Sequence, residues 1–477
     1  MLIRNAHVWP PGAHLATDAT LAKLPPTDVR LAGGRVAECA PGLRPAPGED
    51  DIDAAGGALL PGLHDHHVHL RALAAARASV AAGPPCTHTP ADLAARLRAA
   101  DAELAPGAWL RAVGYHESVA GPLDSRALDR LLPDRPVRVQ HRTGSLWMVN
   151  SLAVAQLDLD GCELSGVERD QAGRPTGRLW RMDRWLADQV PSAAGDLEGV
   201  SRRAGSFGIT GFTDATPGAT ERDLTSLAES AVAQRLLCMA PVGVRPPAMI
   251  TLGPVKILLD DATLPPLREL ADRIRDAHAA GRPAAVHCVT RVQLVLALAA
   301  LDLAGRLPGD RIEHGAIIPA ELLPDLRGLT VVTQPHFVAE RGEQYAKDVA
   351  LDDLPDLWRL RSLIDAGVPV AGGSDAPFGG EDVWRVMRAA THRPRLLRTD
   401  ESVCPARALS LFLGEPAAPG TPRLVAPGRP ADLALLRADP MEALDSLASD
   451  LVAVTFVGGE VVYARGYPRL RSSGSPS

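Results

Sequence analysis

The sequence is short of lysine, lacks runs of basic residues and has no cysteine pair spaced for metal binding. Its 50 Lys or Arg residues are spread along the 477-residue chain and are outnumbered by 57 Asp or Glu residues, which gives a formal charge of −7. Proteins that bind a phosphate backbone normally carry a basic patch, so we expect no nucleic-acid partner. The six cysteines include no Cys-x-x-Cys pair, which excludes a zinc–thiolate motif of that type and gives no sign of a disulfide framework.

Long apolar segments are also missing. No uninterrupted apolar run reaches the ~18 residues that a membrane span needs. The N-terminal stretch MLIRNAHVWPPG has prolines where a signal peptide would continue its apolar region. We therefore expect a cytoplasmic protein without a membrane partner.

Both ends of the chain carry short β-strand patterns. Strands are predicted within 1–9, 28–40, 431–438 and 451–466, and two of these segments contain Gly-Gly pairs that are typical of hairpin turns. We expect residues 1–58 and 411–477 to form one β-sandwich domain.

The middle of the chain alternates short apolar runs with amphipathic helical stretches such as 262–280 and 292–304, which is the pattern of a parallel α/β fold. Eight strands are predicted, at 59–69, 208–214, 235–243, 254–260, 283–288, 310–315, 329–336 and 368–375. They favour a (β/α)8 TIM-type barrel over 59–410, with 71–205 as an insertion that shapes the substrate pocket. A doubly wound sheet is the alternative, but no Gly-x-Gly-x-x-Gly follows the first strand.

Four histidines lie within the six-residue segment HDHHVH at 64–69. Side chains alternate between the two faces of a strand, so His67 and His69 project to one side together with Asp65. Two imidazoles side by side at the end of a strand form half of a metal site. His64 and His66 have the same spacing in the other register, and a solvated strand end is the non-functional alternative.

Lys256 lies inside the apolar run GPVKILL, although only three of the 50 basic residues are lysines. An unpaired ammonium would be costly there. A buried lysine shifts its pKa readily and can react as the neutral amine, which arginine cannot do. The structural alternative is a side chain that reaches out to solvent or pairs with Asp260 or Asp261.

Three further residues lie near the carboxyl ends of predicted strands, namely His287, His314 and Asp375. A lone histidine at such a position is more often a core or surface residue than a ligand. Together with His67, His69 and Lys256 they gather at the end of the barrel where active sites occur, and packing does not require such a convergence.

At this point the chain resembles the amidohydrolase superfamily of metal-dependent barrel hydrolases. The segment PGLHDHHVHL resembles the superfamily's Pro-Gly-hydrophobic-x-Asp-x-His-x-His signature, and GPVKILLDD resembles the strand that carries its bridging lysine. The segments PAAVHC and DRIEHG resemble its two later histidine strands, and AGGSDAP resembles its aspartate strand. The long insertion and the motifs SLWMVNS, GRPTG and TQPHF resemble the branch of YtcJ-like proteins and N-substituted formamide deformylases.

The resemblance implies a binuclear centre with two divalent ions, in first place Zn²⁺, with iron, manganese or cobalt as alternatives. His67 and His69 would bind one ion, His287 and His314 the other. Lys256, as N6-carboxylysine, would bridge both ions, and Asp375 would bind the first ion and act as the general base. A water held between two cations becomes acidic enough to attack a carbonyl, and Asp375 would carry its proton to the leaving nitrogen.

The predicted reaction is therefore hydrolysis of a non-peptide C–N bond in a small molecule, most readily an N-acyl or N-formyl amide. The alternatives are a mononuclear deaminase acting on a small heterocycle, which would not use Lys256, and a non-catalytic binding barrel, which would have lost ligands. A homodimer is compatible with the resemblance.

Substrate contacts are predicted at loop positions and strand ends. The candidates are His116, Glu117, His141, Trp147, Asn150 and His336, the last at the end of the seventh strand. The chain departs from its branch at Ser145, where relatives usually have histidine, and His141 lies four residues earlier.

Overall fold

The computed structural model describes residues 1–10, 12, 21, 23–190, 195–394 and 400–466. These residues divide into two compact units. The large unit consists of the described residues within Met1–Leu70 and Leu197–Ser477, and the insertion unit of those within Arg71–Asp196. The helix α8, at Leu197–Ser206, falls within the predicted insertion range 71–205 but packs against β13, β22 and β23 of the large unit.

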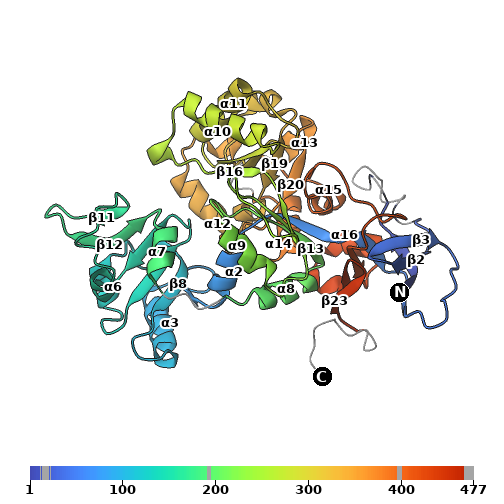
Figure 1. Cartoon of the computed structure of the whole chain (residues 1–477), viewed down its shortest axis with the longest axis horizontal. Helices are drawn as coiled ribbons and strands as arrows, with labels where there is room; N and C mark the ends of the chain where they lie inside the picture. The colour runs from blue at the N-terminus through green and yellow to red at the C-terminus, as the bar shows by residue number, and fades with distance from the viewer. Residues whose placement is uncertain (11, 13–20, 22, 191–194, 395–399, 467–477) are drawn as a thin grey trace. The chain divides into compact units, whose positions relative to one another are not determined.

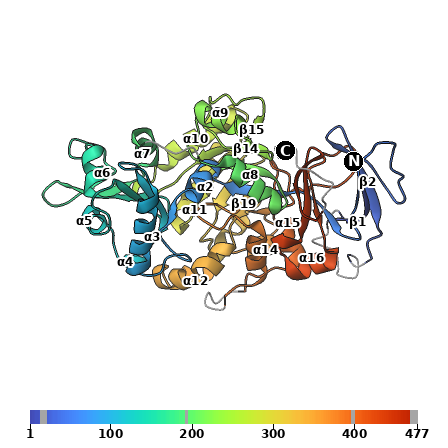
Figure 2. The ribbon, with the colours of Figure 1, turned by 90° about the horizontal axis from the view of Figure 1, so that it is seen from below.

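Strands from both ends of the chain build one eight-stranded sheet of the large unit. Its order is β23-β22-β21-β5-β1-β2-β3, with β4 beside β1. The strands are β1 (Leu2–Val8), β2 (Thr27–Ala32), β3 (Arg35–Ala40), β4 (Asp51–Asp53), β5 (Ala58–Pro61), β21 (Leu433–Leu436), β22 (Val452–Val457) and β23 (Glu460–Ala464). Figures 1 and 2 show these blue and red strands together. Strands of both ends therefore share one sheet, and the β-sandwich domain over 1–58 and 411–477 stays a prediction.

The two Gly-Gly pairs make the predicted hairpins. Gly33 and Gly34 connect β2 to β3 with φ of 57° and 74°, and Gly458 and Gly459 connect β22 to β23 with φ of 58° and 81°. Two successive residues with positive φ match the twist of the flanking strands, and glycine adopts that conformation without a steric cost.

The middle of the large unit holds two parallel sheets. Their orders are β15-β14-β13-β6 and β16-β17-β18-β19-β20. The strands are β6 (Leu63–Val68), β13 (Ile209–Asp214), β14 (Arg235–Cys238), β15 (Ile250–Leu252), β16 (Val255–Ile257), β17 (Ala284–Cys288), β18 (Arg311–His314), β19 (Thr330–Thr333) and β20 (Val370–Gly372). Only two residues separate β15 from β16. At the other edge, the Asp375 N–H donates to the carbonyl of His67 over 2.7 Å.

Helices alternate with these strands along the chain. They are α9 (Glu221–Ala228), α10 (Leu267–Ala279), α11 (Arg291–Ala304), α12 (His336–Asp348), α13 (Arg361–Asp365), α14 (Val383–Thr391), α15 (Pro405–Ser410) and α16 (Pro440–Ser446). Helices α10 and α11 pack on each other and against β17 (Figure 1). Their apolar sides, including Leu270, Ile274, Leu294 and Leu301, are fully buried against the strands.

Several predicted boundaries were wrong, and the predicted strands 235–243, 254–260 and 368–375 end early, at Cys238, Ile257 and Gly372. The predicted strand 59–69 is two strands, because β5 belongs to the eight-stranded sheet and β6 belongs to a parallel sheet. Gly62 lies between these two strands, and a side chain at this position would collide with Thr210. The predicted helix 262–280 begins only at Leu267, since Pro265 and Pro266 precede it. The predicted strand 329–336 ends at Thr333, so His336 begins α12 instead of ending the strand.

The insertion unit has its own six-stranded sheet, in the order β11-β12-β10-β9-β8-β7. Its strands are β7 (Val80–Ala81), β8 (Leu110–Tyr115), β9 (Val137–His141), β10 (Leu146–Val149), β11 (Val167–Arg169) and β12 (Pro175–Trp180). Its helices are α2 (Leu70–Arg77, starting at the unit boundary), α3 (Pro90–Glu103), α4 (Glu117–Ala120), α5 (Ser125–Asp129), α6 (Ser151–Gln156) and α7 (Asp183–Gln189). Among the described residues, no helix is both long and apolar enough to cross a membrane.

Candidate metal centre

The six predicted metal ligands all lie in or just after the strands of the parallel sheets. His67 lies in β6 and His69 follows that strand directly. Lys256, His287 and His314 lie in β16, β17 and β18, and Asp375 follows β20 by three residues. The carboxyl ends of parallel strands meet at one edge, which explains why residues up to 308 positions apart in the chain can share a site.

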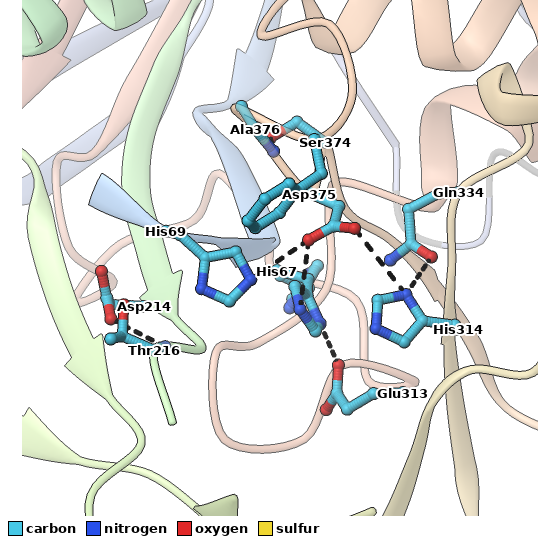
Figure 3. A network of polar contacts seen from close by, with 12 residues as sticks. His67, His69, Asp214, Thr216, Glu313, His314, Gln334, Ser374, Asp375 and Ala376 are labelled. Atoms are coloured by element: carbon cyan, nitrogen blue, oxygen red, sulfur yellow. Dashed lines mark hydrogen bonds and ion pairs between the residues drawn. The ribbon is translucent and has the colours of Figure 1, made fainter. Parts of the chain in front are cut away.

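Asp375 lies at the middle of this group. Its Oδ1 atom is 3.2 Å from Nε2 of His69 and 3.5 Å from Nε2 of His67 (Figure 3). Four ligands at ordinary zinc–nitrogen and zinc–oxygen bond lengths are about 3.3 Å from one another around a tetrahedral ion. One donor atom from each of these three buried residues lies within 4.8 Å of the others. The set therefore has the spacing of ligands around one ion.

The two later histidines extend the group on the other side of Asp375. Nδ1 of His314 lies 4.0 Å from Oδ2 of Asp375, and the His314 ring centroid lies 4.7 Å from that of His67. The ring of His287 lies edge-on to that of His314, with 4.5 Å between centroids. The structure thus brings all four predicted histidine ligands into one chain of neighbouring rings.

Lys256 ends inside the protein. Its Nζ atom is buried and has no hydrogen-bond partner among the described residues. Burial lowers the pKa of the amine, against the opposing effect of the Glu313 and Asp375 carboxylates. The alternative in which Lys256 reaches out to solvent is therefore wrong. The two aspartates that were predicted as alternative partners have other contacts. Asp260 accepts a hydrogen bond from the Ala262 N–H, and Asp261 accepts one from the Thr290 hydroxyl.

Three buried atoms of this group lack a hydrogen bond within the described residues, namely His67 Nε2, Lys256 Nζ and Asp375 Oδ1. Although burial raises the pKa of Asp375, the imidazoles of His69, His314 and His67 lower it well below its ordinary value, so the side chain is a carboxylate. Buried polar atoms without partners are rare and call for an explanation such as a bound ion. Imidazole nitrogen and carboxylate oxygen are donors that suit divalent transition metals, so these residues fit a metal centre.

Two buried side chains that the sequence analysis missed hold the histidines in place. The Glu313 carboxylate contacts Nδ1 of His67 with one oxygen and accepts from Nε of Arg311 over 2.5 Å with the other. Gln334 Oε1 lies 2.9 Å from Nδ1 of His314. When Nδ1 donates a hydrogen bond, the lone pair of Nε2 is left for a ligand bond. For Glu313 a signal was present in the sequence, because Arg-Ile-Glu-His places two opposite charges on one face of a strand, and that strand is fully buried.

Asp65 fixes the loop that carries Asp375. It accepts hydrogen bonds from the Ser374 N–H over 2.9 Å and from the Ser374 hydroxyl over 2.5 Å, as well as from the His67 N–H over 3.2 Å. Burial raises the pKa of Asp65 to about 6. Asp65 therefore joins β6 to the aspartate loop and is not part of the group that surrounds Asp375 Oδ1.

Two of the site residues have unusual backbone conformations. Asp375 has φ of 49° and His314 has φ of 71°. Non-glycine residues with positive φ carry a steric cost, and such residues concentrate at functional sites, where the surrounding structure imposes them. His64 and His66, in the other histidine register, have no positive φ. Nε2 of His64 lies 2.9 Å from the Thr213 hydroxyl, whereas Nδ1 of His64 and both ring nitrogens of His66 are buried without a hydrogen bond within the described residues.

The predicted substrate contacts divide into two kinds. His336 is buried at the first residue of α12, and both of its ring nitrogens lack hydrogen bonds within the described part of the chain. Burial lowers the pKa of His336 to about 3, so the ring is neutral. In the insertion unit, His116, Glu117 and His141 lie together at the ends of β8 and β9.

Trp147 and Asn150 instead have structural contacts within the insertion unit. The Trp147 indole N–H donates to Asp183 over 2.8 Å, and its ring is buried in the unit's core. The fully buried Asn150 accepts from the N–H groups of Val137 and Ala153 and donates to the carbonyls of Leu132 and Arg135, over 2.7–3.1 Å. Its amide is fully used by the backbone, so the predicted substrate contact is not among its interactions.

Comparison with known proteins gives a single family. A model of the amidohydrolase family matches residues 50–463. The N-substituted formamide deformylase of Arthrobacter pascens is 25% identical over 530 residues, covering 92% of this chain and 95% of that protein. A Bacillus subtilis protein named as amidohydrolase YtcJ is 23% identical over 489 residues, covering 88% of this chain and 92% of that protein. The predicted resemblance to this branch is confirmed.

Solved structures are similar over nearly the whole chain. Metal-dependent hydrolases from Pyrococcus horikoshii and Pyrococcus furiosus match with TM-scores of 0.69 and 0.68, at 16% and 18% identity. Each match covers 92% of this chain, and 98% and 99% of those chains. At this identity the likeness concerns the fold, which is of the TIM-barrel type of α/β fold.

Proposed function

The chain belongs to the amidohydrolase family of metal-dependent hydrolases, which act on carbon–nitrogen bonds, and we propose that its own substrate is a small N-acyl or N-formyl amide. The observation that carries the proposal is the buried group of unpaired donor atoms around Asp375 Oδ1. The deformylase name of one relative supports the choice of an N-formyl amide. The strands β15 and β16 count as one in the eight-stranded barrel that we propose for this site.

In this proposal His67, His69 and Asp375 hold one divalent ion, and His287 and His314 hold a second, with Zn²⁺ as the first candidate. When bound, such ions polarise a carbonyl and acidify a water molecule. The chain itself supplies no nucleophile in this proposal. Its residues orient the ligand atoms, exclude bulk water by burial, and provide a carboxylate at Asp375 that accepts a proton.

Asp375 is the proposed general base. Its carboxylate is ionised and lies within 4.0 Å of three imidazoles, which stabilise the negative charge. A proton taken up by Asp375 from the attacking water would be donated to the leaving nitrogen, which departs as a neutral amine. The same carboxyl group thus acts first as base and then as acid.

Lys256 is the proposed bridge, as N6-carboxylysine. Burial favours its neutral amine, which is the form that attacks carbon dioxide. The nitrogen–carbon bond forms, one proton leaves the nitrogen, and the product carries a carboxylate in place of an amine. This change supplies two oxygen donors at a position where an ammonium would repel the ions.

Elemental analysis of the full-length protein tests this function, with Lys256→Ala beside the matched control Lys347→Ala, whose side chain is exposed on α12. We expect at least two transition-metal ions per chain in the wild type and in the control, fewer in Lys256→Ala, and release of one formate per amine from N-formyl amines by the loaded wild type. A metal content that Lys256→Ala does not change would replace the proposal with a mononuclear deaminase. No bound ion would leave a non-catalytic barrel. The homodimer and the cytoplasmic location stay predictions.

A further inference from the structure

The insertion unit contains a second group of metal-type donors, and it is part of no step proposed above. It consists of His116, Glu117 and His141. We propose that these three residues form an independent binding site for a divalent transition-metal ion. The site would be present whether or not the large unit holds its own ions.

The donor atoms have the spacing that a metal requires. Glu117 Oε2 lies 3.0 Å from Nε2 of His141 and 3.8 Å from Nε2 of His116. One donor atom of each residue lies within 4.8 Å of the others, and the two rings are 5.8 Å apart between centroids. Tetrahedral zinc ligands are about 3.3 Å from one another, so shifts of a few tenths of an ångström to about 1 Å in the side chains would close the site.

The backbone holds the two histidines side by side. Strands β8 and β9 are parallel neighbours, and Tyr115 pairs with His141 in their register. The Arg142 N–H donates to the Tyr115 carbonyl over 2.8 Å, directly beside both histidines. Because His116 follows Tyr115 in the chain, both imidazoles project from the same end of the sheet. A site built on paired strand ends costs little ordering when an ion binds.

Each histidine also has a hydroxyl beside its other ring nitrogen. The Ser118 hydroxyl lies 2.9 Å from Nδ1 of His116, and the Thr143 hydroxyl lies 2.8 Å from Nδ1 of His141. The Ser118 and Thr143 N–H groups donate to these nitrogens over 3.1 and 3.3 Å, which places the proton of each neutral ring on Nε2, and Nε2 of His141 lies 3.0 Å from Glu117 Oε2. Binding of an ion at Nε2 therefore requires the ring proton to move from Nε2 to Nδ1, where the Ser118 and Thr143 hydroxyls can accept it.

Charge and exposure fit a metal site that is open on one side. Burial lowers the pKa of His141, which favours the neutral ring that binds metals, while Glu117 is a carboxylate. The side chains of His116 and His141 are 10% and 12% exposed, whereas that of Glu117 is 40% exposed. Two imidazoles and one carboxylate with an open fourth position form a familiar zinc ligand set. The ion would thus keep a place for water or for an anionic group of a ligand.

The test uses full-length protein in which His67→Ala and His69→Ala disable the candidate metal centre of the large unit. After chelation and dialysis, Zn²⁺ is titrated and the bound ion counted, and Co²⁺ is substituted to record its visible absorption. We expect a zinc ion on this background that is lost, with at least a tenfold weaker Kd, when His141→Ala or Glu117→Gln is added. His88→Ala, an exposed histidine of the same unit, is the matched control and should retain the ion.

Equal zinc binding with and without His141→Ala would overturn the proposal. Anomalous diffraction at the zinc edge from wild-type crystals provides a second test that does not depend on the variants folding. A peak within bonding distance of Nε2 of His116, Nε2 of His141 and Glu117 supports the site, and the absence of a peak there overturns it. Either result is independent of the ions that the large unit binds.

Discussion

The Glu313 carboxylate contacts Nδ1 of His67 in the buried interior of the large unit, and its other oxygen accepts a hydrogen bond from Arg311. Both side chains of the Glu313–His67 pair are fully buried. The contact fixes the orientation of the His67 ring and directs Nε2 towards Asp375, which lies 3.5 Å away. The candidate metal centre thus depends on a carboxylate that would not itself bind the metal.

Glu313→Gln should weaken metal binding at the candidate centre. The amide keeps the size of the side chain but removes the charge that makes His67 a stronger ligand, and changes of this kind typically cost 10- to 100-fold in metal affinity. Zinc affinity measured by competition with a chelating dye checks this, with Glu321→Gln as the exposed control. If affinity is unchanged while the protein is merely less stable, Glu313 serves the Arg311 ion pair and not the metal ligand.

Gly379→Ala should disturb His336. A Cβ atom at this position would lie 2.3 Å from Nε2 of His336 and 2.5 Å from the Ser374 carbonyl oxygen, so the ring or the aspartate loop must move. We expect a loss of about 1–3 kcal/mol in the free energy of unfolding. Urea denaturation measures it.

The neighbouring Gly380 provides the control. Its Cβ would meet only Oε1 of Glu340, at 3.1 Å, which is the far end of a flexible side chain. Gly380→Ala should therefore be nearly neutral. Equal losses for both substitutions would show that the loop tolerates neither, and would contradict a specific contact between Gly379 and His336.

Asn150→Ala should destabilise the insertion unit. The side chain caps α6 and makes four hydrogen bonds to buried backbone groups, which would be left without partners. Losing a cap costs ~1 kcal/mol and each unsatisfied buried group ~1–3 kcal/mol, so we expect a total loss of several kcal/mol. Thermal unfolding of the variant beside Gln156→Ala, an exposed change in the same helix, measures it. An active, fully stable variant with a raised KM would instead support the predicted substrate contact.

Asp183 should make the stability of the insertion unit depend on pH. The residue as a whole is exposed, but desolvation of its carboxyl group raises the pKa, although the Trp147 indole and the Gln140 amide donate to its Oδ1 over 2.8 and 3.0 Å. A carboxyl whose pKa is higher in the folded than in the unfolded state binds its proton more tightly when folded. Its contribution to the free energy of unfolding is therefore greatest below the unfolded pKa of about 3.9 and falls as pH rises through the folded pKa.

Asp183→Asn removes this titration and keeps an oxygen that accepts from Trp147. The stability of the variant relative to the wild type should rise as pH increases above about 4 and then level off. Urea unfolding at a series of pH values measures the difference, with the exposed Asp188→Asn of α7 as the control. A difference that shrinks with increasing pH would show that the Asp183 carboxylate is stabilised, not penalised, in the folded state.

The residues of the candidate centre could be predicted because they follow from local patterns. His67 lies in a segment with four histidines, His287 follows the apolar run Ala-Ala-Val, and a lysine in a chain of arginines draws attention to Lys256. Strand direction then places them at one end of a parallel α/β fold, since parallel strands connected by helices present their carboxyl ends together. The two terminal hairpins were predictable for the same reason, because two adjacent glycines are a local requirement of the turn.

Only the tertiary structure decided which atoms meet. The contact of Glu313 with His67 joins residues 246 positions apart, and that of Asp65 with Ser374 joins residues 309 positions apart. No local pattern gives such pairs, because strand order and the direction of loops set them. His336 was placed on a strand when it begins a helix, and Asn150 was read as a substrate contact when the backbone uses its whole amide. The sequence by itself determined which residues are candidates for the chemistry and at which end of their strands they lie, and the packing of distant segments determined which of them come together, which hold their neighbours in place and which stabilise the fold.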